Sequence, residues 1–163
     1  MWLFKLLGIA AALFAAAVVS RRYSEYITLR AELTRGFSEL LMHIKNKISV
    51  TLAPPSELIE GFESEALSRV GFISRTRELG SPKEAYRDMS RSLPLSEGTR
   101  RVLDGYFSGF GGVYFGELIR LSEAAHSSLA EISEAECRAL PREKKLSRTV
   151  IFAVALGAVI LLI

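Results

Sequence analysis

The chain has 163 residues, which is the usual length of one domain, and it carries 21 lysines and arginines against 18 aspartates and glutamates. This nearly even balance argues against a nucleic-acid-binding protein, which would carry a marked excess of positive charge. Hydrophobic residues make up 49% of the chain and are concentrated at its two ends.

The first end, residues 1–20, is predicted to be an N-terminal transmembrane helix. Lys5 is the only charged residue before Arg21, and the run from Met1 is long enough for a bilayer core of about 30 Å at roughly 1.5 Å per residue. A cleaved signal peptide is the alternative, because small residues at 15–17 resemble a cleavage site. Arg21 and Arg22 follow the apolar run directly, which favours a retained anchor.

An amphipathic helix is expected to continue from the first one. Its apolar positions repeat at three and four residues: Leu29, Leu33, Phe37, Leu40, Ile44 and Ile48. Pro54 and Pro55 predict its end, since proline removes a backbone donor and disfavours helix in the residue before it. Ser56 is then expected to cap a second helix that carries apolar residues at Leu58, Ile59, Phe62 and Leu67.

Two further helix starts are predicted at serines. Ser81 precedes Pro82 and stands three residues before Glu84, which is the pattern of a capping box with proline at the first helical position. Ser96 begins a similar segment, whose expected buried face is Val102, Leu103, Tyr106, Phe107 and Phe110. Strand-like alternation is not convincing anywhere, so the fold class is predicted to be all-α, a helical bundle.

Glycines are dense in the stretch FSGFGGVYFGE, at positions 109, 111, 112 and 116. A turn between two long helices is the favoured interpretation, and a hinge or phosphate-binding loop is the alternative. No lysine of the Walker type follows and no strand precedes the stretch. Helical spacing resumes at Leu118, Leu121, Ala125, Leu129 and Ile132 and continues toward Pro141.

The second apolar end, residues 149–163, is predicted to be a C-terminal transmembrane helix. It contains no polar side chain after Thr149, so it offers no face to water. Because it is short, spanning requires local thinning of the bilayer or help from Leu146 and the stems of Lys145 and Arg148. We expect this tail to end within lipid.

Positive charges flank both apolar segments on the side of the central region, residues 21–148. The predicted membrane-surface residues are Arg21, Arg22, Arg142, Lys144, Lys145 and Arg148. Positively charged flanks stay in the cytoplasm, so a two-pass protein of the cell membrane with a cytoplasmic central domain is predicted.

Small residues recur at four-residue spacing in both apolar segments, at Gly8, Ala12 and Ala16 and again at Ala153 and Gly157. Such stripes allow close packing of helices in lipid, so contact between the two spans through these residues is predicted. The alternative is that alanine and glycine are simply common in membrane helices.

The sequence offers little support for catalysis. His43 and His126 each lie within a helical pattern, Cys137 is the single cysteine, and no group of Cys, His and acidic residues has metal-ligand spacing. We therefore predict a protein that is not an enzyme and that has neither a metal site nor a cofactor.

Four stretches resemble the stage III sporulation protein AB family of spore-forming bacteria: WLFKLLG, PPSELIEGF, LSEGTRRVLDGYFSGFG and REKKLSRTVIFAVALGAVILLI. The resemblance covers essentially the whole chain. It implies a helical domain similar to the platform proteins of type II secretion, held by two membrane helices on the mother-cell side.

The partners that the resemblance implies are the cytosolic sporulation ATPase, the other membrane proteins of the mother cell-to-forespore channel complex and the lipid bilayer, with a homo-oligomer as a further possibility. A membrane-anchored helical scaffold or stalk subunit of another complex is the alternative.

Overall fold

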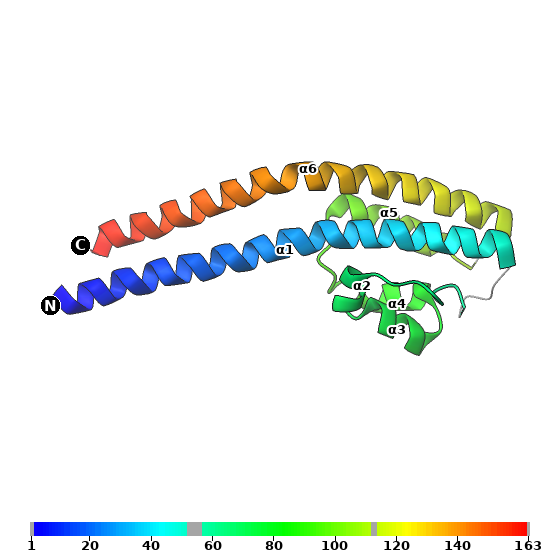
Figure 1. Cartoon of the computed structure of the whole chain (residues 1–163), viewed down its shortest axis with the longest axis horizontal. Helices are drawn as coiled ribbons and strands as arrows, with labels where there is room; N and C mark the ends of the chain where they lie inside the picture. Colours follow the sequence, from blue (N-terminus) through cyan, green and yellow to red (C-terminus); the bar gives the residue numbers. More distant parts are fainter. Residues whose placement is uncertain (1, 52–56, 112–113, 163) are drawn as a thin grey trace. The chain divides into compact units, whose positions relative to one another are not determined.

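The computed structural model of the chain describes residues 2–51, 57–111 and 114–162, apart from the side chains of residues 2–7, 51, 115, 158, 161 and 162. The described residues form helices and no strand, which confirms the all-α prediction. The helices are α1 (Trp2–Thr51), α2 (Glu65–Arg69), α3 (Phe72–Leu79), α4 (Pro82–Met89), α5 (Glu97–Gly109) and α6 (Phe115–Leu162) (Figure 1).

The chain divides into two compact units. The terminal unit comprises Met1–Thr28 and Cys137–Ile163, and the central unit comprises Leu29–Glu136. Helices α1 and α6 both contribute to each unit. The boundaries predicted after residues 20 and 148 separate membrane-spanning segments from a cytosolic domain. They do not describe compact units of the fold, so they stay a prediction.

A hydrophobic core holds the central unit together. The predicted stripe on α1 is buried from Leu33 to Ile48, and Leu29 packs against the core from its edge. The same core includes residues of α2, α3, α4, α5 and α6 and of the C-cap of α5: Leu67, Phe72, Ala85, Tyr86, Leu103, Tyr106, Phe107, Phe110, Leu118, Ala125 and Leu129. Phe37 contacts the ring of Phe72 edge-on with centroids 5.0 Å apart. Burial of these side chains is the main stabilising contribution to the unit.

The short helices begin and end where the sequence provides caps. Ser81 and Ser96 occupy the predicted N-cap positions of α4 and α5 with extended backbones, and Pro82 is at the first position of α4. The hydroxyl of Ser96 accepts a hydrogen bond from the Thr99 amide at 3.3 Å, whereas that of Ser81 makes no capping bond. Gly80 ends α3 with a φ of 64°, a conformation that favours glycine.

The helix predicted to start at Ser56 is wrong in its extent. Ser56 lies outside the described residues, residues 57–61 form turns, and the helix α2 starts only at Glu65. Lys47 on α1 donates from Nζ to the backbone carbonyls of Glu57 and Glu60, both at 2.8 Å. These bonds satisfy carbonyls that a helix would otherwise pair, so the segment can bury Leu58 and Ile59 in the turns and Phe62 just after them without helical structure.

The glycine-rich stretch connects α5 to α6, as predicted. Gly111 has a φ of 86°, which an L side chain rarely adopts, while Gly116 already belongs to α6. Gly112 lies outside the described residues. Helix α6 then continues through Pro141, which has no backbone N–H and so cannot bond to the carbonyl four residues earlier, that of Cys137.

Residues 2–20 and 149–162 are helical. In the described part of the chain, no helix contains an apolar stretch of 18 residues that is sufficient to cross a membrane. The two predicted transmembrane helices are therefore not supported by the described residues.

Candidate functional site

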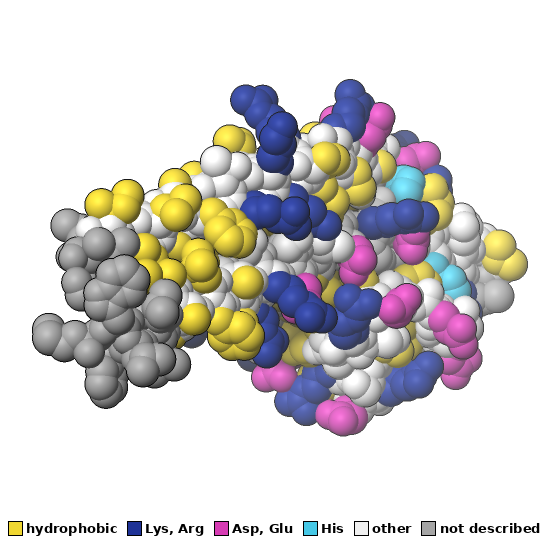
Figure 2. Space-filling view, turned by 60° about the vertical axis from the view of Figure 1, so that its left-hand side comes forward, with side chains coloured by type: hydrophobic (Ala, Val, Ile, Leu, Met, Phe, Trp, Pro, Cys, Tyr) yellow, Lys and Arg dark blue, Asp and Glu magenta, His cyan; other side chains and the backbone are white. Residues whose placement is uncertain are grey.

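The terminal unit exposes an unusual number of large apolar side chains. On α1 they are Leu13, Phe14, Val18 and Val19, and on α6 they are Leu146, Val150, Phe152, Val154, Leu156 and Ile160. Phe14 and Ile160 are each 72% exposed. At about 100° per residue, these positions point over most of the circumference of each helix. Figure 2 shows such side chains spread over the visible face of this unit. Continuous apolar surface of this kind marks contact with a membrane or a partner.

Five residues of the terminal unit have small exposed fractions: Ala16, Ser20 and Ile27 on α1, and Ala155 and Val159 on α6. Of the predicted packing residues, only Ala16 belongs to this set. Ala12 is half-buried, Gly8 and Ala153 are exposed, and a Cβ added to Gly157 would have no neighbour within 4 Å.

Among the described side chains of this unit, Ala153 and Gly157 are therefore not buried in a helix contact, and the packing of the two spans through them in lipid stays a prediction. Ala155 and Val159 have the same four-residue spacing but lie two residues further along the helix. The sequence pattern contained this stripe as well, and nothing local distinguished the two faces.

The predicted membrane-surface residues lie next to the apolar surface on both helices. Arg21, Arg22, Arg142, Lys145 and Arg148 are exposed, and Lys144 is half-buried. We call these six residues the basic collar. It is accompanied by two tyrosines that sequence reasoning missed, Tyr23 and Tyr26, which are 45% and 49% exposed with ring centroids 6.5 Å apart. Tyrosine and arginine next to an apolar segment are typical of a membrane interface.

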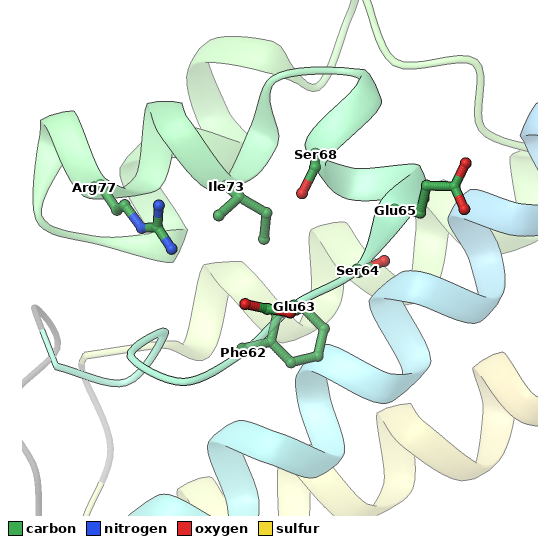
Figure 3. A pocket seen from close by; sticks show the side chains of 7 residues that line it. All are labelled: Phe62, Glu63, Ser64, Glu65, Ser68, Ile73 and Arg77. Atoms are coloured by element: carbon green, nitrogen blue, oxygen red, sulfur yellow. The ribbon is translucent and has the colours of Figure 1, made fainter.

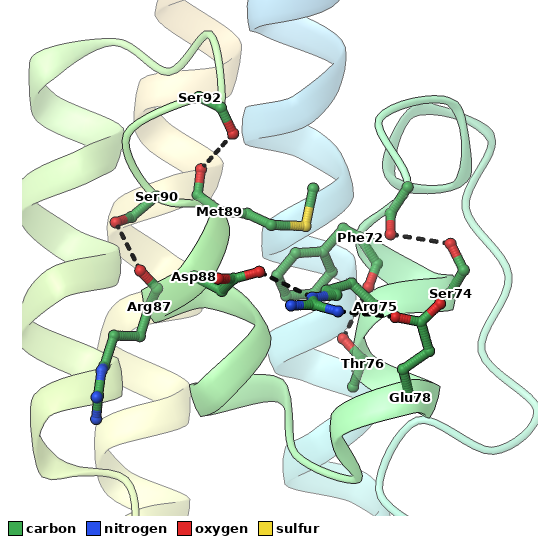
Figure 4. A network of polar contacts seen from close by, with 11 residues as sticks. Phe72, Ser74, Arg75, Thr76, Glu78, Arg87, Asp88, Met89, Ser90 and Ser92 are labelled. Carbon is green, nitrogen blue, oxygen red and sulfur yellow. Dashed lines mark hydrogen bonds and ion pairs between the residues drawn. The ribbon is translucent and has the colours of Figure 1, made fainter.

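A polar network joins α3 and α4 in the central unit. Arg75 donates from Nε to Asp88 Oδ2 at 2.8 Å and from Nη1 to Glu78 Oε2 at 2.9 Å (Figure 4). Arg75 and Asp88 also line a cleft of about 670 Å³, whose full lining is Arg75, Leu79, Glu84, Arg87, Asp88, Ser90 and Arg91. We call it the α3–α4 cleft. Arg91 has no ion-pair partner among the described residues, so one cation of the cleft is available to another molecule.

A second hollow, of about 450 Å³, lies beside α2 and α3 (Figure 3). Phe62 and Ile73 provide apolar lining, and the other lining residues are polar or charged: Glu63, Ser64, Glu65, Ser68 and Arg77. Both hollows are open and have mixed charge, which suits contact with the surface of another protein better than enclosure of a small substrate.

The two histidines have structural surroundings. Nδ1 of His126 on α6 lies 3.0 Å from both the hydroxyl and the carbonyl oxygen of Ser38 on α1, so it ties these helices together. Burial lowers the pKa of His43, the charge of Lys47 lowers it further, and a backbone hydrogen bond with Glu60 opposes both. Ser38 itself is buried, which leaves its hydroxyl out of reach of a substrate.

The tyrosine hydroxyls of the core are held as hydrogen-bonded groups. Tyr86 donates to Asp104 Oδ1 at 2.7 Å, and the Tyr106 hydroxyl lies 3.1 Å from Ser122 Oγ. Burial raises the pKa of Tyr106 to about 12. Among the residues that the structure describes, no three His, Cys, Asp or Glu side chains are grouped to hold a metal ion. Cys137 is exposed.

Comparison with protein-family models, with curated proteins and with solved structures finds no match for this chain.

Proposed function

We propose that the protein is a membrane-anchored helical adaptor, in which the terminal unit is embedded in the bilayer and the central unit docks a cytosolic protein. The observation that carries this proposal is the apolar surface of the terminal unit, which ends at the basic collar and at Tyr23 and Tyr26. Exposure of this surface to water costs about 25 cal/mol per Å² of apolar area, a cost that lipid removes.

The finer proposal is that both helical ends cross the bilayer. The apolar run in the sequence begins at Met1, before the first described side chain at Gly8. The C-terminal run is shorter than a bilayer core of about 30 Å, and the exposed Leu146 together with the long stems of Lys145 and Arg148 extends it. The collar orients the central unit toward the cytoplasm.

The central unit contributes a docking surface and no chemistry of its own in this proposal. Its surface carries interspersed charges of both signs, and the α3–α4 cleft presents Arg87 and Arg91 beside Glu84. Charge patterns of this kind select a partner and accelerate association. The resemblance to stage III sporulation protein AB supplies the specific form of the proposal: a platform that links a cytosolic sporulation ATPase to a channel complex between mother cell and forespore.

The test combines membrane extraction with co-purification from sporulating cells. The wild-type chain should stay in the membrane pellet after an alkaline wash and should recover the cytosolic ATPase in detergent. Simultaneous Arg87→Glu and Arg91→Glu substitutions should leave the chain in the pellet but abolish that recovery, because like charges then oppose docking. Arg101→Glu on α5, an exposed arginine that does not line the cleft, controls for the reversal of a charge elsewhere on the central unit.

Release of the wild-type chain by the alkaline wash would overturn membrane anchoring. Normal recovery of the ATPase with the double variant would exclude the α3–α4 cleft as its docking site.

A further inference from the structure

A pocket of about 420 Å³ lies in the terminal unit, at the junction of the apolar surface and the basic collar. Helix α1 lines it with Ala17, Ser20, Arg21, Ser24 and Glu25, and helix α6 lines it with Arg148 and Phe152. The membrane proposal leaves the pocket without a role, because an anchor alone needs no hollow lined by two arginines.

The polar lining of the pocket suits an anion. Arg21 donates from Nε to Glu25 Oε1 at 3.0 Å, so its two terminal nitrogens remain for another acceptor. Arg148 has no ion-pair partner among the described residues. Two guanidinium groups against one carboxylate leave the lining with net positive charge, and guanidinium forks match the oxygens of a phosphate group.

The serines add uncharged hydrogen-bonding groups to this lining. Ser20 is nearly buried, at 9% exposure, and its hydroxyl lies on the same side of α1 as Ser24, one turn further on. Hydroxyls donate to phosphate oxygens as readily as to water, so an occupant with several acceptor oxygens would satisfy them.

The apolar lining of the pocket lies on the side of the apolar segments. Ala17 precedes Arg21 by one helical turn, and Phe152 follows Arg148 by one turn. Arg21 and Arg148 are also the charged residues nearest to the described apolar run on each helix. The pocket thus changes from charged to apolar over a single turn, as a phospholipid does between its phosphate and its acyl chains.

We propose that this pocket binds the phosphate group of an anionic phospholipid, with the start of an acyl chain against Phe152 and Ala17. The proposal rests on the membrane location proposed above, because the ligand belongs to the bilayer. It adds a specific lipid site to a general attraction between the basic collar and anionic lipids.

The experiment uses the full chain reconstituted into nanodiscs of phosphatidylglycerol and phosphatidylcholine in equal amounts. After mild detergent release, native mass spectrometry counts the lipids that each chain retains. Washing in about 1 M salt reduces the Debye length to about 3 Å, which suppresses diffuse attraction but spares a bound headgroup. The wild-type chain is expected to retain phosphatidylglycerol in preference to phosphatidylcholine.

Arg21→Gln or Arg148→Gln should lower the retained phosphatidylglycerol about ten-fold, since each removes charge-assisted hydrogen bonds to the phosphate. The controls Arg22→Gln and Arg142→Gln each remove one charge of the same collar outside the pocket lining, and they should change retention less than about two-fold under the high-salt wash. Equal losses in pocket and control variants would overturn the site, as would equal retention of both lipids by the wild-type chain.

A competition experiment distinguishes binding of a lipid headgroup from binding of free phosphate. Millimolar inorganic phosphate should leave the lipid bound, because it lacks the apolar contacts with Phe152, and complete displacement would overturn the lipid assignment. Incorporation into nanodiscs, measured by co-elution, distinguishes the two proposals. A chain that incorporates but retains no phosphatidylglycerol refutes only the lipid site, whereas a chain that fails to incorporate refutes the membrane anchor and the site with it.

Discussion

The hydroxyls of Ser81 and Ser96 occupy equivalent N-cap positions but differ in what they bond. Ser96 Oγ accepts from the Thr99 amide and lies 2.8 Å from Thr99 Oγ1, which in turn lies 2.9 Å from Thr34 Oγ1 on α1. Ser81 makes no side-chain capping bond. Ser96→Ala should therefore lower the free energy of unfolding by about 1 kcal/mol, and Ser81→Ala by a few tenths. Chemical denaturation of the full chain in detergent, followed by circular dichroism, measures both, and equal losses would contradict the assigned cap.

His43 should make the central unit sensitive to acid. Its pKa is about 6.5 in the unfolded chain and lower in the folded chain, because burial and Lys47 disfavour the protonated ring. As the pH falls through about 6.5, the ring is protonated in the unfolded chain before it is protonated in the folded chain. The free energy of unfolding therefore decreases as the pH falls from about 6.5 to the lower pKa of the folded state.

His43→Gln removes the titrating ring and should flatten this dependence. The comparison is the difference in unfolding free energy between wild type and variant at pH values above and below 6.5. A difference that stays constant over that range would show that His43 titrates alike in both states.

At the scale of elements, two helical glycines differ in the space around them. A Cβ at Gly36 on α1 would lie 2.9 Å from Ser64 Oγ and 3.2 Å from Leu67 Cγ, so α2 packs directly on this glycine. A Cβ at Gly105 on α5 would have no neighbour within 4 Å. Gly105→Ala should raise the free energy of unfolding by about 0.5–1 kcal/mol through helix propensity.

Gly36→Ala gains the same propensity but loses more through overpacking, which typically costs about 1–3 kcal/mol. We expect Gly36→Ala to lower the free energy of unfolding by about 1 kcal/mol in total. Its denaturation midpoint should lie below that of the wild type, whereas the midpoint of Gly105→Ala should lie above it. If both alanines stabilise, α2 is not held against α1 as the structure has it.

The periodicity of apolar residues was sufficient to predict the long helices. Phe37 and Ile44 are buried because a 3.6-residue period places them on one face, and this information is local. The segment after residue 56 was mispredicted because its carbonyls pair with Lys47, ten and thirteen residues away from Glu57 and Glu60. No local pattern contains such a bond, and the same buried side chains fit a helix or a turn.

The candidate site was predictable only in part for a similar reason. Runs of apolar residues and the basic residues beside them can be read directly from the sequence. The pocket that joins Arg21 to Arg148 depends on which faces of α1 and α6 meet, and small residues at Gly157 and at Ala155 indicate different faces equally well. Phe152 lines the pocket because of the way in which α1 and α6 pack together.

At the scale of the whole molecule, topology gives the sharpest prediction. The single cysteine, Cys137, is exposed and lies five residues before Arg142 of the basic collar, so it should face the cytoplasm. A membrane-impermeant maleimide should label it only after cells are permeabilised. A Glu63→Cys variant in a Cys137→Ser background should behave in the same way, and labelling of either cysteine in intact cells would contradict the cytoplasmic orientation.

Helices α1 and α6 differ in bending stiffness. Helix α1 contains no proline between Trp2 and Thr51, so its hydrogen-bond ladder resists bending and twisting throughout. Helix α6 lacks one backbone hydrogen bond, because Pro141 has no N–H to donate to the carbonyl of Cys137. A mechanical load on α1 is therefore passed along its whole length, whereas α6 yields first around residues 137–141. If a motor pulls on this protein, α1 transmits the force and α6 supplies the compliance.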